Sequence, residues 1–261
     1  MTRDEVPRAQ EKLLALRSGN ACAYPKCGVS LILEAEHPDD SDKTVGKVAH
    51  ICAASEGGPR YDPNMTSKER SSAANLIFLC GPHHDGIDSQ LNHHTVEFLR
   101  DAKAKHEQAI ARAAAYAMGQ VRFDHLEIVC RALQLGCDDI NEDIVMPLEV
   151  DDKIRINELG DSTREQILLG LAKVEEVKKF IHTMDTFKPN FGLKLAARFK
   201  QEYFGLVADG LHGDELYSSI VYTAQQNAGP VDNPEVRAAV LAVVAYLFST
   251  CEIFEHEPTA A

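Results

Sequence analysis

The chain contains two short pairs of residues of the types that bind zinc. Cys22 and Cys27 are separated by Ala-Tyr-Pro-Lys, and Cys80 and His83 are separated by Gly-Pro. Tetrahedral zinc is commonly held by two such pairs, each on a tight turn that directs both ligands to one point. Prolines and glycines lie in or beside both pairs and favour such turns. The spacing therefore predicts a structural zinc site, with buried free thiols as the alternative.

A histidine between the two pairs has the chemistry of a general base. His50 lies at the end of the apolar stretch 45–51, which predicts a short strand, and the loop Gly57-Gly58-Pro59 follows it. Because the pKa of histidine is ordinarily close to neutral, a histidine at a strand end can abstract a proton from water. The alternative is a partly buried structural histidine.

Two further residues belong to this pattern. Asn75 opens the apolar segment 75–80, and His84 follows the proposed zinc ligand His83 directly. If His83 binds zinc, the side chain of His84 must point elsewhere. We therefore predict that His84 binds a second, catalytic metal ion.

Residues from about 10 to 110 resemble an HNH endonuclease domain of the ββα-metal type. The motifs that carry the resemblance are AHI at 49–51, GGPR at 57–60, NLIFLC at 75–80, HH at 83–84 and IDSQ at 87–90. The later positions Leu99, Lys103, His106 and Glu107 resemble the helix that closes such domains in bacterial defence nucleases.

The resemblance implies a role for each of three residues. It makes His50 the general base and His84 a ligand of a catalytic Mg²⁺ or Mn²⁺, and it makes Asn75 either a ligand of that ion or a brace for the loop of the base. One position departs from the pattern, since many members have Asp where this chain has Ala49. Asp88 or substrate oxygens are the candidates to complete the metal shell.

Basic side chains flank the motif in the sequence. We predict that they contact the phosphates of nucleic acid, which gives salt-sensitive binding without sequence preference. Taken singly, each would be interpreted as a solvated surface charge, but their position on both sides of the motif favours phosphate contacts. The predicted contacts are Lys47, Arg60, Lys68 and Arg70.

Length and charge divide the chain of 261 residues into two parts. Residues 1–118 carry 14 Lys and Arg against 16 Asp and Glu, whereas residues 119–261 carry 13 against 24. The second part would repel duplex DNA, which favours a role in docking or regulation. The expected fold class is α+β: a ββα-metal HNH nuclease domain with structural zinc over residues 1–118, followed by an all-α domain over residues 119–261.

Apolar periodicity predicts the helices of the second part and the helix that leads into it. A helix over 95–118 closes the first domain, and the acidic stretch 136–160 reads as a loop. A capped helix begins at Asp161-Ser162 with its apolar stripe reaching residue 184, and the last helix begins at Asn233-Pro234 and runs to about residue 254. Two further helices are predicted over 191–207 and 214–226.

Residues 153–159, the amphipathic helix after them and the terminal segment 242–255 resemble the carboxyl-terminal module of ABC-three-component, or Lamassu-type, defence proteins. In those proteins the module resembles an adaptor that joins a variable effector to an SMC-like coiled-coil ATPase. The alternative is that segment 242–255 is simply a buried helix of a small bundle.

Together these features predict a metal-dependent DNA endonuclease that is the effector of a bacterial anti-phage defence complex and that oligomerises on activation. Two alternatives remain: an HNH nuclease activated by a cyclic nucleotide, and an inactive zinc-binding module that binds DNA or protein. Four of the seven cysteines lie in the first hundred residues as candidate ligands or near His50. The remaining Cys130, Cys137 and Cys251 show no disulfide-like pattern, which favours the cytoplasm. The longest apolar run, 238–248, is too short to cross a membrane.

Overall fold

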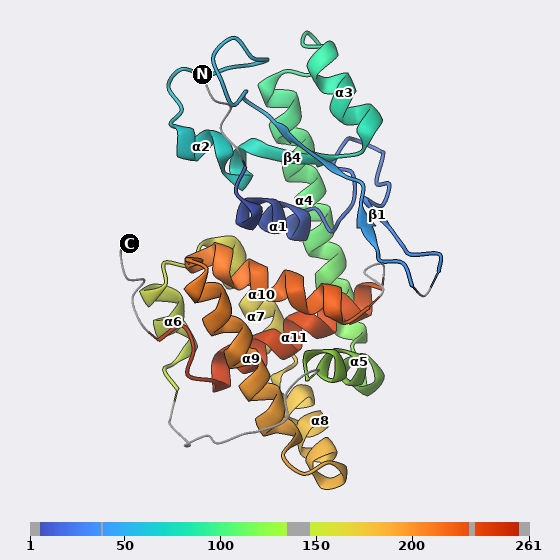
Figure 1. Ribbon diagram of the computed structural model, residues 1–261, viewed down its shortest axis with the longest axis vertical. Helices are drawn as coiled ribbons and strands as arrows, with labels where there is room; N and C mark the ends of the chain where they lie inside the picture. Colours follow the sequence, from blue (N-terminus) through green and yellow to red (C-terminus); the bar gives the residue numbers. More distant parts are fainter. Residues whose placement is uncertain (1–5, 38, 135–146, 230–232, 256–261) are drawn as a thin grey trace. The chain divides into compact units, whose positions relative to one another are not determined.

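The computed structural model describes residues 6–37, 39–134, 147–229 and 233–255 (Figure 1). It divides the chain into two compact units, Met1–Arg112 and Ala113–Ala261. The division falls within the long helix α4, which spans Val96–Gln120. The boundary predicted at residue 118 lies in the same helix.

The first unit combines short helices with two small antiparallel sheets. Besides the first part of α4, its elements in chain order are α1 Arg8–Arg17, β1 Ile32–Leu33, β2 Lys43–Thr44, β3 Lys47–His50, α2 Ser67–Ser71, the 3₁₀ helix η1 Ala73–Asn75, β4 Leu76–Leu79 and α3 Gly81–Ser89. One sheet joins β1 to β2 and the other joins β3 to β4.

The sheet of β3 and β4 positions the residues of interest. Its register pairs Lys47 with Leu79 and His50 with Leu76. All four residues of β4 are buried, and α3 follows β4 and packs against β3. The strand predicted around His50 and the apolar segment that Asn75 opens are thus paired with each other.

In the part that the structure describes, all regular secondary structure of the second unit is helical. Its elements, besides the last part of α4, are α5 Phe123–Leu133, α6 Val150–Ile156, α7 Asp161–Leu171, α8 Val174–Phe187, α9 Phe191–Ala208, α10 Gly213–Asn227 and α11 Pro234–Thr250. Helix α11 packs against α5, α7, α8 and α10, and Figure 1 shows it among the other helices of this unit. Since its side chains are apolar nearly all round, α11 can form the centre of the unit.

The helix predictions for the second unit are confirmed in most places and wrong in three. Helix α6 lies inside stretch 136–160, which was predicted as a loop; residues 135–146 lie outside the described part. Two helices, α7 and α8, form where a single helix is predicted from residue 161 to 184, and Ala172 and Lys173 separate them. Gly160 rather than Asp161 is the N-cap of α7. Helix α11 ends at Thr250, not near residue 254.

The early end of α11 is explained by a buried lysine. Lys153 on α6 is fully buried, and its Nζ donates to the carbonyl oxygens of Phe248, at 2.9 Å, and Cys251. The Glu255 carboxylate lies 3.4 Å away. Burial lowers the pKa of Lys153, and the Glu255 charge opposes that shift. One turn later, the side-chain amide of Asn157, the C-cap residue of α6, donates to the Phe254 carbonyl at 2.8 Å. Helix α6 and its cap thus satisfy carbonyls at the end of α11 and in the segment that follows it.

We expect Lys153→Met to destabilise the second unit by about 3–5 kcal/mol, because it leaves two buried carbonyls without their donor and the half-buried Glu255 carboxylate without its ion pair. The measurement is the free energy of unfolding from urea denaturation. Lys179→Met on α8 is the matched control, since Lys179 is exposed. Equal unfolding midpoints for the two variants would contradict the role given to Lys153.

The terminal aromatic residues belong to the core of this unit. Phe248 and Phe254 are fully buried, and their rings lie 5.1 Å apart between centroids. Both phenylalanines thus lie in the core, as expected from the alternative interpretation of segment 242–255, although the helix ends at Thr250. Among the described residues, no helix has the length and apolar character needed to span a membrane.

Candidate functional site

The four predicted zinc ligands lie together in the first unit. The ligand atoms of Cys22, Cys27, Cys80 and His83 are all within 4.8 Å of one another. The Nδ1 of His83 is 3.2 Å from the Cys80 sulfur and 3.6 Å from the Cys22 sulfur. Bond lengths of about 2.3 Å for Zn–S and about 2.0 Å for Zn–N imply ligand separations of this order around a tetrahedral ion. The cluster could hold a metal such as zinc.

Local backbone geometry builds the first pair of ligands. The Cys27 amide donates to the Tyr24 carbonyl at 3.0 Å, and Lys26 and Gly28 adopt left-handed φ angles of 64° and 61°. The Cys22 amide donates to the Val29 carbonyl at 2.9 Å, which closes the turn. This tight turn brings the two cysteines of the pair to the same side.

The second pair lies where β4 passes into α3. Cys80 is the N-cap residue of α3, and Pro82 occupies the first turn, where a missing amide proton costs nothing. The Cys80 amide donates to the Cys22 sulfur at 3.3 Å, a hydrogen bond that links the two pairs. Burial raises the pKa of the Cys22 thiol to about 12. A metal ion would offset the cost of the buried thiolate, which fits the donor set.

Sequence reasoning missed the residues that hold His83 in place. The ring of Tyr24 stacks on the His83 ring, with centroids 3.9 Å apart and an interplanar angle of 7°. The Tyr24 hydroxyl lies 3.1 Å from Nε2 of His94, which is buried, and burial lowers the pKa of that histidine. The position of Tyr24 between Cys22 and Cys27 was a signal that could have indicated this contact.

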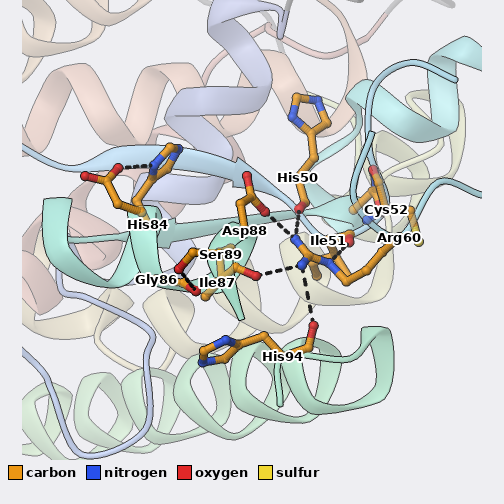
Figure 2. A network of polar contacts seen from close by, with 12 residues as sticks. His50, Ile51, Cys52, Arg60, His84, Gly86, Ile87, Asp88, Ser89 and His94 are labelled. Atoms are coloured by element: carbon orange, nitrogen blue, oxygen red, sulfur yellow. Dashed lines mark hydrogen bonds and ion pairs between the residues drawn. The ribbon is translucent and has the colours of Figure 1, made fainter. Parts of the chain in front are cut away.

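His50 and His84 come from the two elements that pack together beside this cluster. His50 is the last residue of β3 and is half-buried, and His84 lies in the first turn of α3. The imidazole of His50 points away from the guanidinium of Arg60 (Figure 2). Their elements, β3 and α3, are separated in the chain by β4, so both histidines depend on the β3–β4 pairing.

Asn75 braces the chain just after His50. Its side-chain oxygen accepts from the Cys52 amide at 2.9 Å, and its side-chain nitrogen donates to the carbonyls of Cys52, at 2.8 Å, and Arg70, at 2.9 Å. The Ile51 amide also donates to the Asn75 carbonyl at 2.8 Å. Of the two roles predicted for this buried asparagine, these contacts fit the brace.

A carboxylate accompanies His84. Nδ1 of His84 is 3.0 Å from the Asp85 carboxylate, which also accepts from Lys47 at 3.2 Å. Hydrogen bonds from His84 and then from Lys47 hold the pKa of Asp85 below its ordinary value. Within the described ranges, His84 does not belong to a group of three His, Cys, Asp or Glu ligands. Asp88, a candidate for the metal shell, instead forms an ion pair with Arg60 at 2.7 Å.

Arg60 does not have the exposed position expected of a phosphate contact. Only 6% of its side chain is exposed. Its guanidinium donates to the carbonyls of Ile51 and Ile87, both at 2.8 Å, and to the Asp88 carboxylate (Figure 2). The folded chain surrounds the guanidinium with acceptors, and this position disfavours a phosphate contact for Arg60.

The three other predicted phosphate contacts differ in exposure. Lys68 is exposed on α2, and Lys47 is exposed and paired with Asp85. Arg70 is half-buried, donates to the Met65 carbonyl and lies over the Tyr61 ring, 5.6 Å from its centroid. The two lysines are thus the more accessible of the predicted contacts.

One comparison with known proteins finds a match within the second unit. Residues 131–255 match the family model of C-terminal domain 10 of the ABC-three component (ABC-3C) systems. No curated protein and no solved structure matches the chain. The match supports the predicted carboxyl-terminal module of the ABC-three-component type, and it is consistent with a system made of several protein components.

Proposed function

We propose that the chain is a metal-dependent HNH DNA endonuclease, the effector of an anti-phage defence complex of the ABC-3C type. The single observation that carries the proposal is the order β3, β4, α3 with His50 on the strand and His84 on the helix. The adjoining Cys₃His cluster and the brace from Asn75 support it. Spacing in the sequence does not by itself require these residues to lie together on one pair of strands and one helix.

The chemistry proposed for the chain's own residues is hydrolysis of a phosphodiester. His50 takes a proton from a water molecule, and general base catalysis of this kind typically contributes about 10²–10⁴-fold. Asp85 accepts a hydrogen bond from Nδ1 of His84 and thereby orients the ring, leaving Nε2 for a metal ion. A bound Mg²⁺ or Mn²⁺ would supply charge neutralisation at the phosphate. His84 would hold it with water and substrate oxygens, since Ala49 offers no ligand and Asp88 is paired with Arg60.

Zinc has a separate, structural role in this proposal. It would be held by Cys22, Cys27, Cys80 and His83, a closed set of four ligands. Such a set leaves no position for substrate. Lys47 and Lys68 are the residues proposed to contact the DNA backbone, and their exposure supports that use.

The second unit is proposed to dock the nuclease to a partner, namely an SMC-like coiled-coil ATPase of a Lamassu-type complex. Its ABC-3C family match supports a protein partner, and its acidic charge disfavours DNA. The cyclic-nucleotide alternative has no such support from the matched family. Homo-oligomerisation on activation remains part of the proposal, because one HNH site cuts one strand at a time.

The proposal is tested by incubating the full chain with supercoiled plasmid and Mg²⁺ or Mn²⁺. We expect nicked and then linear DNA, and no cutting in EDTA. Addition of cyclic nucleotides separates the second hypothesis from the first. Absence of cutting with either ion, with or without nucleotides and neighbouring gene products, would favour the inactive zinc-binding module.

The docking role makes its own prediction. Full-length protein should capture the products of neighbouring genes in a pull-down, whereas a chain ending near Met118 should not, because it lacks the ABC-3C module. The truncated chain must retain zinc to count as folded. Equal capture by a zinc-loaded truncated chain and by the full chain would show that the second unit is not the adaptor.

A further inference from the structure

Arg60 joins the strand that carries His50 to the helix that carries His84. On the strand side, its guanidinium donates to the Ile51 carbonyl at 2.8 Å and to the His50 carbonyl at 3.4 Å. On the helix side, it donates to the Ile87 carbonyl at 2.8 Å and to the Asp88 carboxylate at 2.7 Å. Figure 2 shows the guanidinium at the centre of this network, between the two elements.

The contacts of Arg60 require a planar group with several hydrogen-bond donors, as in a guanidinium. A guanidinium is planar and presents several donors in fixed directions, whereas a lysine ammonium is a single point charge on a flexible stem. Arg60 donates through Nε and both terminal nitrogens to His50 at the end of β3, to Ile51 just after it, and to acceptors on α3. A buried cation persists only where such partners satisfy it, so this arrangement restricts how β3 and α3 can move relative to each other.

The backbone at this position points to the same conclusion. Arg60 has a left-handed φ of 57°, a conformation that a residue other than glycine adopts at a cost. The segment around it is tied as well, because the Ala53 amide donates to the Pro59 carbonyl at 3.2 Å. The contacts of the side chain, rather than backbone preference, therefore favour arginine here.

We propose that Arg60 is a positioning residue, which sets the geometry between the base His50 and the metal ligand His84. The inference rests on the proposed nuclease function and assigns Arg60 a role that needs no contact with DNA. A displacement of about 1 Å between reacting groups can cost about 10²-fold in rate. Loss of the guanidinium should therefore lower the rate of the chemical step and leave DNA affinity unchanged.

The test compares full-length Arg60→Gly, Arg60→Lys and the control Arg100→Lys, an exposed arginine on α4. The glycine variant lacks the guanidinium, and glycine adopts the left-handed φ without steric cost. Single-turnover plasmid cleavage yields a rate constant and an amplitude for each variant. We expect Arg60→Gly and Arg60→Lys to lower the rate constant by about 10–100-fold with the amplitude and the KM for DNA unchanged.

Amplitude and rate constant separate positioning from mere stability. If Arg60 only stabilised the fold, its loss would reduce the fraction of active molecules, hence the amplitude, and leave the rate constant as in the wild type. Guanidinium ion at millimolar concentration should partly restore the rate constant of Arg60→Gly and have no effect on Arg60→Lys. Zinc content, measured by elemental analysis, should stay at the wild-type value in all variants.

If Arg60→Gly does not fold, Asp88→Asn tests the same ion pair from the other side. Asp88 is about half exposed, so we expect this variant to fold. It should lower the rate constant several-fold, and additional Mn²⁺ should not restore it. Restoration by Mn²⁺ would instead make Asp88 a metal ligand and overturn the inference. A wild-type rate constant for the Arg60 variants, with His50→Ala inactive, would also overturn it and leave the nuclease proposal intact. Wild-type protein that never cuts DNA would remove both.

Discussion

Cys22→Ser protein is expected to lose its zinc and with it the folded first unit. Structural zinc in small domains contributes about 10–16 kcal/mol of binding free energy, which is also folding free energy. Apart from the first part of α4, the first unit has only short strands and short helices, so little else could replace that contribution. Cys22 is fully buried, and the Cys80 amide donates to its sulfur, so the substitution removes both a ligand and the link between the two pairs.

The measurements are zinc content by elemental analysis and thermal unfolding with and without EDTA. We expect about one zinc per wild-type chain, an early unfolding transition for Cys22→Ser, and the same early transition for wild-type protein in EDTA. Cys52→Ala is the matched control, because Cys52 is buried in the same unit and is not in the cluster. Well-folded wild-type protein without any metal would show that the cluster is a group of free thiols.

His50→Ala is expected to fold, to keep its zinc and to lose DNA cutting by at least about 10²–10⁴-fold. The side chain is only half-buried and lies at the end of β3, and the loop after it is held by Asn75 and Arg60. Its removal should therefore leave the unfolding temperature nearly unchanged. Single-turnover cleavage of plasmid DNA measures the loss.

His84→Ala is the companion variant, and it should fail in a different way. It weakens binding of the catalytic ion, so cutting should return in part at higher metal concentration or with Mn²⁺. His50→Ala should not respond to metal, because a proton acceptor and not a metal ligand is missing. Cutting by His50→Ala at the wild-type rate would show that another residue is the base.

The features that sequence reasoning could predict are those encoded over a few residues. The Cys22/Cys27 and Cys80/His83 pairs were recognisable because each lies on one turn, and their two turns meet in the structure. The Asn233 cap was recognisable for the same reason, and its side chain accepts from the Val236 amide at 2.9 Å. Helices with a regular apolar period, such as α9 and α10, were also predictable from the sequence.

Predictions from local sequence patterns are wrong where contacts with distant residues determine the secondary structure. The acidic composition of stretch 136–160 predicts a loop, yet α6 forms within it. There Lys153 binds the end of α11, and Asn157 binds the segment after α11. The partners of Lys153 lie about a hundred residues later in the chain. A lysine is ordinarily a surface residue, so nothing in its neighbourhood in the sequence signals burial.

By itself, the sequence determined which residues can bind metal, which segments form regular helices and which half carries the acidic charge. Those properties follow from residue type and short spacing. Only the tertiary structure decided that Asn75 braces the loop after His50, that Lys47 pairs with Asp85 beside His84 and that Arg60 is buried between β3 and α3. The physical reason is that a polar side chain is buried only where the fold supplies its acceptors, and for Arg60 these come from α3, 27 and 28 residues further along the chain.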